Sequence, residues 1–193
     1  MQARIVSDTS YCGIKTMKNP LDFWVYQELI WELKPDVVVE VGNLHGGSAA
    51  ALADFMVKCG GGGVIAIDID HSRIHELARS RSNIDWIEGD ATSVFPEVQE
   101  RVGNKTCLVI EDSLHSYENT LSVLAHYSQL VSKGSYMIVE DTICHHGLGV
   151  GPNPGPFEAV ETFLQQTELF ELDASRESWG ITWNPGGYLK RIG

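Results

Sequence analysis

Three acidic side chains follow two apolar runs of this sequence, at positions suited to a metal ion. Asp112 ends the run TCLVIED (106–112), and Glu140 and Asp141 end the run SYMIVED (135–141). If the runs are neighbouring strands, the three carboxylates meet at one edge of a sheet, where like charges raise one another's pKa. A hard divalent cation resolves that conflict, and a small set of oxygen ligands is typical of Mg²⁺. The alternative is that these acids cap the helices that follow.

A histidine stands beside the first of these acids. His115 follows Asp112 by three residues, and its imidazole could accept a proton from a metal-held hydroxyl, since an unperturbed pKa of about 6.5 suits a base at neutral pH. The alternative is a solvent-facing histidine at a helix start. His145 and His146 lie in the loop 144–157, where contact with substrate or metal competes with an ordinary surface position. We therefore predict catalytic roles for Asp112 and His115.

A glycine-rich turn after the run DVVVEV (36–41) is placed to bind a nucleotide-like cofactor. Its sequence, EVGNLHGGS (40–48), lets the backbone approach a ligand where a helix N-terminus also points. The GxxxG spacing departs from GxGxxG, which disfavours NAD. An amino-acid carboxylate and ammonium would suit this turn, although the glycines could serve backbone geometry alone. The predicted cofactor contacts in the turn are Glu40, Gly42, Asn43, Gly46 and Ser48.

Further aspartates follow the next two apolar runs. Asp68 ends GVIAID (63–68), at about the distance beyond the glycine turn at which an acid reaches a ribose hydroxyl. Asp90 follows IDWIEG (84–89), where it could accept a hydrogen bond from an adenine amino group or cap a helix. Asp70 is open to the same capping interpretation. We expect Asp68 and Asp90 to join the cofactor contacts.

The elements that must position these residues alternate along the chain. Apolar, β-branched runs predict strands at 36–41, 63–68, 84–89, 106–112 and 135–141. The intervening segments have helical character, and such alternation predicts right-handed crossovers and a parallel sheet. The fold class is therefore α/β.

Other segments complete this expected architecture. Apolar spacing predicts helices at 49–59 and 115–134, and a further helix is expected at 158–168. Asn19-Pro20 supplies an N-cap and a favoured first residue for a helix ahead of the sheet. Near the C-terminus, the turn Pro185-Gly186-Gly187 predicts a hairpin-like ending.

The composition is that of a single globular unit. Among 193 residues, 43% are hydrophobic and 21% are charged, so we predict one domain over 1–193, with an N-terminal segment and helix (1–35) and an α/β core (36–193). No segment has the roughly 20 apolar residues of a membrane helix, and the N-terminus lacks the apolar core of a secretory signal. The expected location is cytoplasmic.

Charge and cysteine usage exclude several classes of partner. The formal net charge is −12, from 26 acidic and 14 basic residues, which disfavours nucleic acid and anionic membranes. The four cysteines form no CxxC pair, so neither a zinc knuckle nor a redox motif is expected.

Four blocks of sequence carry a family resemblance. They are NPLDFWVYQELIWELKPDVVVEVGNLHGGSA (19–49), EDSLHSYENTL (111–121), YMIVEDT (136–142) and NPGGYLKRI (184–192). In this order they resemble the cephalosporin hydroxylase family, which also includes rhamnosyl O-methyltransferases, over about residues 11–193. That family is similar to class I S-adenosylmethionine-dependent methyltransferases. The resemblance implies a Rossmann-like, doubly wound, mostly parallel seven-stranded sheet with an antiparallel last strand and helices on both faces.

The resemblance also implies ligands for several residues. It places Glu40, Gly42 and Ser48 in the loop for S-adenosylmethionine and Asp68 at the ribose. The implied Mg²⁺ ligands are Asp112, Glu140 and Asp141.

The resemblance has one departure near the metal motif. The family's Asp-Ser-Asp-His motif reads Asp112-Ser113-Leu114-His115 here, so the third acid is missing while the ligand Asp112 is retained. The layout is similar to catechol O-methyltransferase, in which the base also lies three residues after the first metal ligand. His115 stands where the catechol enzymes have lysine.

These implications predict an S-adenosylmethionine- and Mg²⁺-dependent O-methyltransferase that acts on a hydroxyl of a small metabolite such as a sugar, a phenol or an antibiotic intermediate. The alternatives are a non-catalytic cofactor-binding partner protein and a hydroxylase, although no two-His-one-carboxylate iron triad is evident from the spacing. A homo-oligomer is expected because the family tends to assemble.

Overall fold

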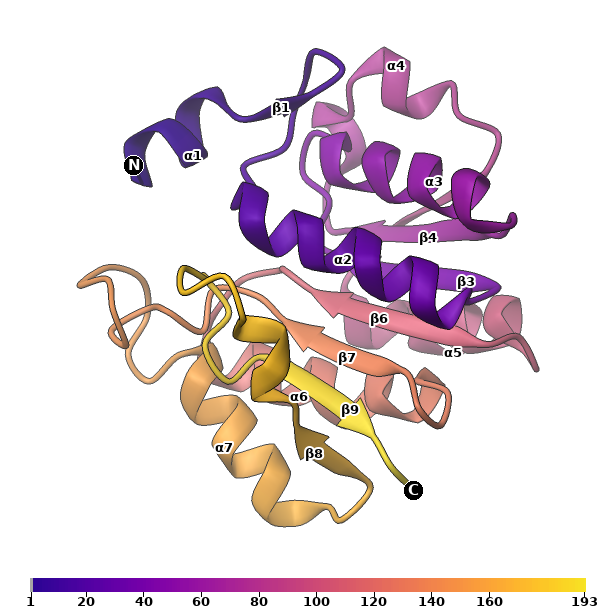
Figure 1. Cartoon of the computed structure of the whole chain (residues 1–193). Coiled ribbons are helices and arrows are strands. Elements are labelled where there is room, and N and C mark those ends of the chain that lie inside the picture. The colour runs from indigo at the N-terminus through magenta and orange to yellow at the C-terminus, as the bar shows by residue number, and fades with distance from the viewer. Residues whose placement is uncertain (1) are drawn as a thin grey trace.

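A central sheet with helices on both faces makes up the computed structural model, which describes residues 2–193 (Figure 1). The helices are α1 (Gln2–Asp8), α2 (Pro20–Leu33), α3 (Gly47–Cys59), α4 (Glu76–Arg79), α5 (Ala91–Val102), α6 (Tyr117–Tyr127) and α7 (Pro156–Gln166), with 3₁₀ helices η1 (His71–Arg73), η2 (Ser128–Leu130) and η3 (Ala174–Glu177). The strands are β1 (Ser10–Tyr11), β2 (Ile14–Lys15), β3 (Val37–Val41), β4 (Gly63–Asp68), β5 (Ile84–Glu88), β6 (Cys107–Glu111), β7 (Tyr136–Val139), β8 (Phe170–Leu172) and β9 (Tyr188–Arg191).

The large sheet has the strand order β5-β4-β3-β6-β7-β9-β8. Strands β3, β4, β5, β6 and β7 pair in parallel with one another, whereas β9 is antiparallel to both β7 and β8. The prediction of a mostly parallel seven-stranded sheet with an antiparallel last strand is therefore confirmed. The chain builds outward from β3 to β5 on one side and from β6 to β7 on the other. The strand order thus reverses between β3 and β6, where ligands bind in open α/β sheets.

The apolar runs form strands because they are buried on both faces. In β3, Val37, Val39 and Val41 pack into the core with α5, α6 and α7, while Val38 packs into the core with α2 and α3. Glu40 shares the face of Val38 and is fully buried. A carboxyl group in such a strand has lost its hydration, so it is charged only where a cation or hydrogen-bond donors lie close to it.

Helix α2 confirms the predicted start at Asn19-Pro20. The side-chain oxygen of Asn19 accepts a hydrogen bond from the Leu21 N–H at 3.1 Å. The helix ends at Lys34, whose left-handed φ of 47° stops it before the first strand of the large sheet. This helix therefore fixes the position of the residues just before it.

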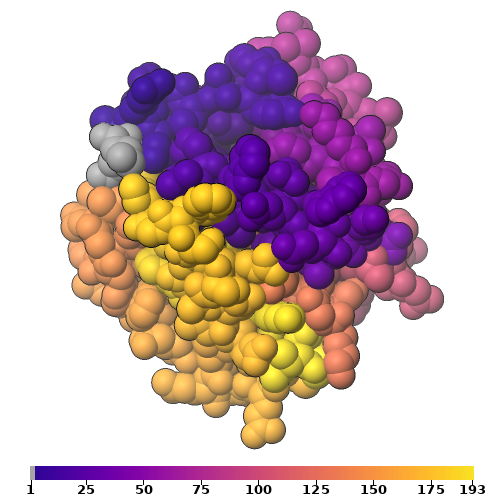
Figure 2. All heavy atoms as spheres, in the orientation of Figure 1, coloured from indigo at the N-terminus to yellow at the C-terminus, as the bar shows by residue number. Residues whose placement is uncertain are grey.

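The N- and C-terminal segments meet on one face of the molecule (Figure 2). Asp22 of α2 accepts hydrogen bonds from the Thr182 hydroxyl at 2.6 Å, the Trp183 N–H at 2.8 Å and the Tyr188 hydroxyl at 3.1 Å. These contacts tie the C-terminal segment to the helix that precedes the sheet.

Several predicted boundaries differ from the structure, and one predicted pairing is wrong. The helix expected over 115–134 is α6, which gives way to η2 and ends well before Gly134. Helix α7 begins two residues earlier than expected, because Pro156 takes its first position and Glu158 accepts a hydrogen bond from the Gly155 N–H at 2.7 Å. The hairpin-like ending is wrong, because β9 pairs with β7 and β8 rather than with the residues before its turn.

The N-terminal residues add elements that the pattern did not predict. Helix α1 and the short antiparallel pair β1–β2 precede α2. None of the helices in residues 2–193 has the length and apolar character that a membrane crossing requires.

Candidate functional site

A cavity of about 430 Å³ opens at the carboxyl edge of the parallel strands. This volume lies within the range of small-molecule pockets in proteins. The predicted site residues that line it are Gly42, Asn43, Ser48, Asp68, Asp90, Asp112, His115 and Asp141. The sheet thus brings together eight side chains or backbone segments that the sequence singled out.

The glycine turn after β3 is fixed by a close backbone approach. Gly42 has a φ of 89°, and a Cβ at this position would overlap the backbone carbonyl of Asp112. Glycine is therefore required where the ends of β3 and β6 meet. Gly46 instead packs against the side chains of Ala78 and Trp86, and it does not line the cavity.

Asp68 holds the same turn from the neighbouring strand. Its Oδ2 accepts hydrogen bonds from the Asn43 N–H at 3.0 Å and the Leu44 N–H at 2.8 Å. Leu44 has a left-handed φ of 42°, a conformation that this carboxylate helps to maintain. Asp68 therefore shapes the cofactor turn and also lines the cavity.

The capping interpretation is observed for the other two aspartates. Asp90 Oδ1 accepts hydrogen bonds from the Ser93 N–H at 3.0 Å and the Thr92 hydroxyl at 2.6 Å, which caps α5 and lowers the pKa of Asp90. Asp70 caps η1 through the Ser72 N–H at 2.8 Å. Asp90 lines the cavity as well, so a cap and a ligand contact remain compatible there.

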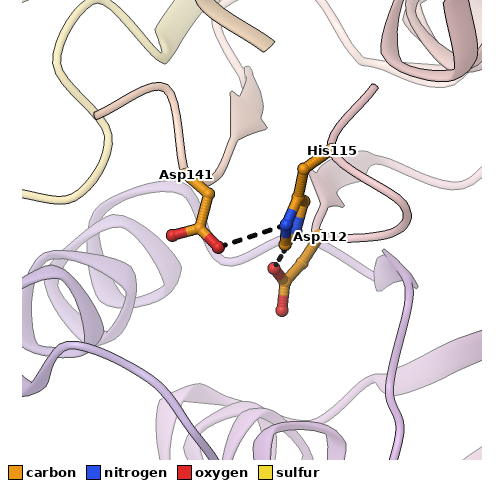
Figure 3. A group of neighbouring side chains, drawn as sticks. All are labelled: Asp112, His115 and Asp141. Atoms are coloured by element: carbon orange, nitrogen blue, oxygen red, sulfur yellow. Dashed lines mark hydrogen bonds and ion pairs between the residues drawn. The ribbon is translucent and has the colours of Figure 1, made fainter. Parts of the chain in front are cut away.

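A cluster of two carboxylates and one imidazole lies at the edge of the cavity (Figure 3). His115 Nε2 lies 3.1 Å from Asp112 Oδ1, and His115 Nδ1 lies 3.4 Å from Asp141 Oδ2. One ligand atom from each residue falls within 4.8 Å of the others. His115 and Asp141 both have left-handed φ values, 59° and 56°, which are uncommon outside sites that require a fixed geometry.

The charges in this cluster shift one another's pKa. Burial lowers the pKa of His115, but its hydrogen bond with Asp112 and the charges of Asp112, Asp141 and Glu111 together raise that pKa to about 9. Burial also raises the pKa of Asp141, with His115 opposing the shift. The imidazolium is therefore the cation that balances these two carboxylates.

Lys18 is a member of this site that the sequence analysis missed. It is 5% exposed, and its ammonium group donates hydrogen bonds to Asp112 Oδ2 and, at 2.6 Å, to Glu140 Oε1. Glu40 Oε1 lies 3.7 Å from the same nitrogen. Glu140, one of the three predicted metal ligands, is thus bonded to Lys18, and it does not belong to the cluster of Asp112, His115 and Asp141.

Two buried acids near the cavity, Glu40 and Glu111, have carboxylate oxygens without a hydrogen-bond partner. Burial raises the pKa of Glu40 to about 7 although Lys18 opposes the shift, and neither carboxylate oxygen of Glu40 has a hydrogen-bond partner. Glu111 accepts hydrogen bonds from the Ser113 hydroxyl at 2.6 Å and from Asn119 at 3.4 Å, while its Oε2 has no partner. Such groups mark a site that can accept further donors or cations.

The two histidines of the loop after β7 have partners nearby in the sequence. His146 Nε2 lies 2.7 Å from Glu158 Oε1, and the His146 ring stacks on Phe157. His145 Nε2 lies 3.1 Å from the Gly151 carbonyl oxygen. Both loop histidines therefore contact residues of the loop or of α7.

Leu114 stands in the sequence where the resembled family has a third acid. It is 69% exposed and lines the cavity. An apolar side chain at this edge adds no charge to the cluster, and it offers an apolar surface to whatever the cavity binds.

The donor set fits a hard divalent cation. Asp112 and Asp141 offer carboxylate oxygens within reach of one ion, and this oxygen chemistry suits Mg²⁺. The cavity fits a nucleoside-type cofactor, because it runs from the glycine turn past Asp68 and Asp90 to the acid cluster.

Comparison with known proteins identifies the family. The family model "Rhamnosyl O-methyltransferase/CmcI" matches residues 3–192. The rhamnosyl O-methyltransferase of Mycobacterium tuberculosis (strain ATCC 25618 / H37Rv) is 34% identical over 191 residues, which cover 95% of this chain and 78% of that protein. The rhamnosyl O-methyltransferase of Mycobacterium leprae (strain TN) is 34% identical over 192 residues, which cover 95% of this chain and 83% of that protein.

Solved structures agree with this match. A structure described as "cmcI-D160 Mg-SAM" aligns with a TM-score of 0.75 at 26% identity over 97% of this chain and 78% of that chain. An O-methyltransferase from Bacillus cereus in complex with SAH aligns with a TM-score of 0.63 at 15% identity over 80% of this chain and 73% of that chain, which supports the fold alone. The chain therefore belongs to the rhamnosyl O-methyltransferase/CmcI family of S-adenosylmethionine-dependent O-methyltransferases.

Proposed function

We propose that this chain methylates a hydroxyl of a small metabolite, with S-adenosylmethionine in the cavity and a divalent cation, Mg²⁺, at the acid cluster. The observation that carries this proposal is the position of Asp112, His115 and Asp141 at the edge of a cavity that also contains the glycine turn. Among sugar, phenol and antibiotic acceptors, the curated rhamnosyl O-methyltransferases favour a sugar hydroxyl. The solved relative described as a Mg-SAM complex supports the choice of cation.

The cofactor would be held from several strand ends at once. The turn at Gly42 and Asn43 would face its amino-acid part, and Glu40 lies behind that turn as an anion with unused acceptor oxygens. Asp68 would accept hydrogen bonds from the ribose, and Asp90 would contact the adenine. The bound sulfonium supplies a methyl group that an acceptor oxygen can take, with the sulfur leaving as a neutral thioether.

Asp112 and Asp141 would hold the cation, because their oxygens already lie around one point. A bound Mg²⁺ supplies positive charge that stabilises a deprotonated acceptor oxygen. The third predicted ligand, Glu140, gives its Oε1 to Lys18, so it would join this set through Oε2 or after that contact opens. The residues therefore fit the cation with two carboxylates from two neighbouring strand ends.

His115 in its neutral form would accept the proton of the acceptor hydroxyl. A divalent cation held by Asp112 and Asp141 would favour that form, because it replaces the imidazolium as the positive charge beside these carboxylates. The His115 ring lines the cavity beside Asp112, and the two carboxylates fix the orientation of both ring nitrogens. Catalysis would come mainly from this orientation and from exclusion of water, because the acceptor oxygen must be held in line with the methyl group.

Calorimetric titration with S-adenosylmethionine and, separately, with NAD tests the cofactor. We expect S-adenosylmethionine to bind with and without Mg²⁺, and NAD not to bind. The variant Asp68→Asn should weaken S-adenosylmethionine binding by about tenfold, the effect of losing one charged hydrogen bond. NAD binding, or no S-adenosylmethionine binding to the wild-type protein, would refute the proposal.

A further inference from the structure

Lys18 is a buried cation in the position where a metal site would be expected to have its ion. Its ammonium group contacts Asp112 and Glu140, which follow the neighbouring strands β6 and β7, and lies 3.7 Å from Glu40 of β3. A lysine with 5% exposure has little water around it, so these carboxylates replace its hydration. The contact therefore joins three strand ends through one charge.

The carboxylates depend on Lys18 as much as it depends on them. Glu40 is fully buried, and neither of its oxygens has a hydrogen-bond partner. Within residues 2–193, its ion pair is with Lys18. Glu140 is 7% exposed and is bonded to the same nitrogen. Removing one partner of a buried ion pair leaves an uncompensated charge, which is strongly destabilising.

The two oxygens of Asp112 face two different partners. Oδ2 accepts from Lys18, whereas Oδ1 faces His115 and the side of the cluster where Asp141 lies. A divalent cation at that cluster would share Asp112 with Lys18 and would meet the repulsion of a positive charge on the opposite oxygen. Lys18 also keeps Glu140 bonded outside the cluster.

The chain fixes Lys18 in this position. The next residue, Asn19, caps α2, and Met17 before it has a left-handed φ of 57°. The preceding backbone packs closely on α3, since a Cβ at Gly47 would overlap the Lys15 carbonyl. The ammonium is thus held by the start of a helix rather than by a mobile terminus.

We propose that Lys18 is an internal counter-cation that competes with the divalent cation for Asp112 and Glu140, and that it lowers the affinity of the site for Mg²⁺. This inference rests on the metal site proposed above. It makes Lys18 a positioning residue, which stabilises the metal-free protein and holds Glu140 and one oxygen of Asp112 away from the metal.

The test compares wild-type protein with Lys18→Met, which removes the charge and keeps an apolar stem. Without its counter-cation, the metal-free variant in EDTA should have a thermal midpoint lower by about 5–10 °C. Calorimetric titration with Mg²⁺ alone should show affinity raised by about tenfold or more, because repulsion is removed and Glu140 is released. Lys133→Met, at an exposed lysine, is the control and should change neither value.

A second variant distinguishes the release of Glu140 from the change in net charge. It also provides a test if Lys18→Met does not fold. Lys18→Met combined with Glu40→Gln restores the net charge of the cluster while leaving Glu140 free. We expect this protein to bind Mg²⁺ more tightly than wild type. Mg²⁺ affinity equal to or below wild type in the variants that fold, including no binding by any of them, would overturn the role of Lys18. Titration of the same proteins with S-adenosylmethionine shows separately whether the proposed cofactor site is correct.

Discussion

Asn184 fixes the backbone of Asp141, because its Oδ1 accepts a hydrogen bond from the Asp141 N–H at 3.1 Å. Asn184 is 1% exposed, and its amide nitrogen donates to the Tyr26 hydroxyl at 2.8 Å. A residue near the C-terminus therefore links α2 to the end of β7. This link holds Asp141 in its left-handed conformation beside His115.

Replacing Asn184, which is not itself a proposed metal ligand, should lower the affinity of the metal site for Mg²⁺. Asn184→Ala leaves the Asp141 N–H without its acceptor and should lower the free energy of unfolding by about 1–3 kcal/mol. Mg²⁺ affinity, measured by calorimetry, should fall by about tenfold, as expected when an outer-shell partner of a ligand is removed. Asn104→Ala, at an exposed position, serves as the control. Unchanged Mg²⁺ affinity in a folded Asn184→Ala protein would show that the link is structural only.

Gly42 should tolerate no side chain. Gly42→Ala places a Cβ against the Asp112 carbonyl, so the ends of β3 and β6 must move apart. We expect the free energy of unfolding to fall by about 1–3 kcal/mol in urea titration, and S-adenosylmethionine binding to weaken in parallel. Gly134→Ala is the matched control, since Gly134 also has a positive φ, 84°, and a Cβ there meets nothing within 4 Å. Equal stability of the two variants would contradict this account of the turn.

Asp90 allows its two roles to be separated. Serine is also a favoured N-cap, so Asp90→Ser should retain the cap of α5 and change stability by only a few tenths of a kcal/mol. The adenine contact needs the carboxylate, and S-adenosylmethionine should bind Asp90→Ser about tenfold more weakly. Asp90→Ala should show the same loss of binding together with a loss of about 1 kcal/mol of stability. If Asp90→Ser bound the cofactor normally, capping would be the whole role of this residue.

His115 should matter for turnover more than for binding. His115→Gln removes the proton acceptor, and kcat should fall by about 100-fold or more, while S-adenosylmethionine affinity stays within about twofold. His146→Gln is the control, because the His146 ring contacts Glu158 of α7. Steady-state kinetics with an accepted hydroxyl substrate provides the measurement. A turnover rate that survives His115→Gln would assign proton removal to another group.

Much of this site could be predicted from the sequence, because strands buried on both faces have continuous apolar runs that are easily recognised. The run of β3 contains three valines before Glu40, and such runs predict parallel strands whose carboxyl ends share an edge. The same pattern predicts that Asp112 and Asp141 lie together at this edge, and the structure brings them there. The pattern also places Asp68 beside the glycine turn.

Lys18 could not be predicted in the same way. It is 94 residues from Asp112 in sequence, and it lies before α2 rather than at the end of a strand. The packing of that helix on one face of the sheet brings the ammonium group of Lys18 to the carboxylates. The C-terminal error has a similar cause, since the turn at Gly186 predicts a reversal but does not specify that β9 enters between β7 and β8.

The most direct test of the central claim is transfer of a labelled methyl group from S-adenosylmethionine to sugar and catechol hydroxyls, by wild-type protein and by Asp112→Asn, in Mg²⁺ and in EDTA. We predict transfer by the wild-type protein in Mg²⁺, with a loss of about 100-fold or more in EDTA or in the variant, because Asp112 holds the cation that stabilises the acceptor oxygen. Undiminished transfer by Asp112→Asn, or by the wild-type protein in EDTA, would contradict the proposed mechanism.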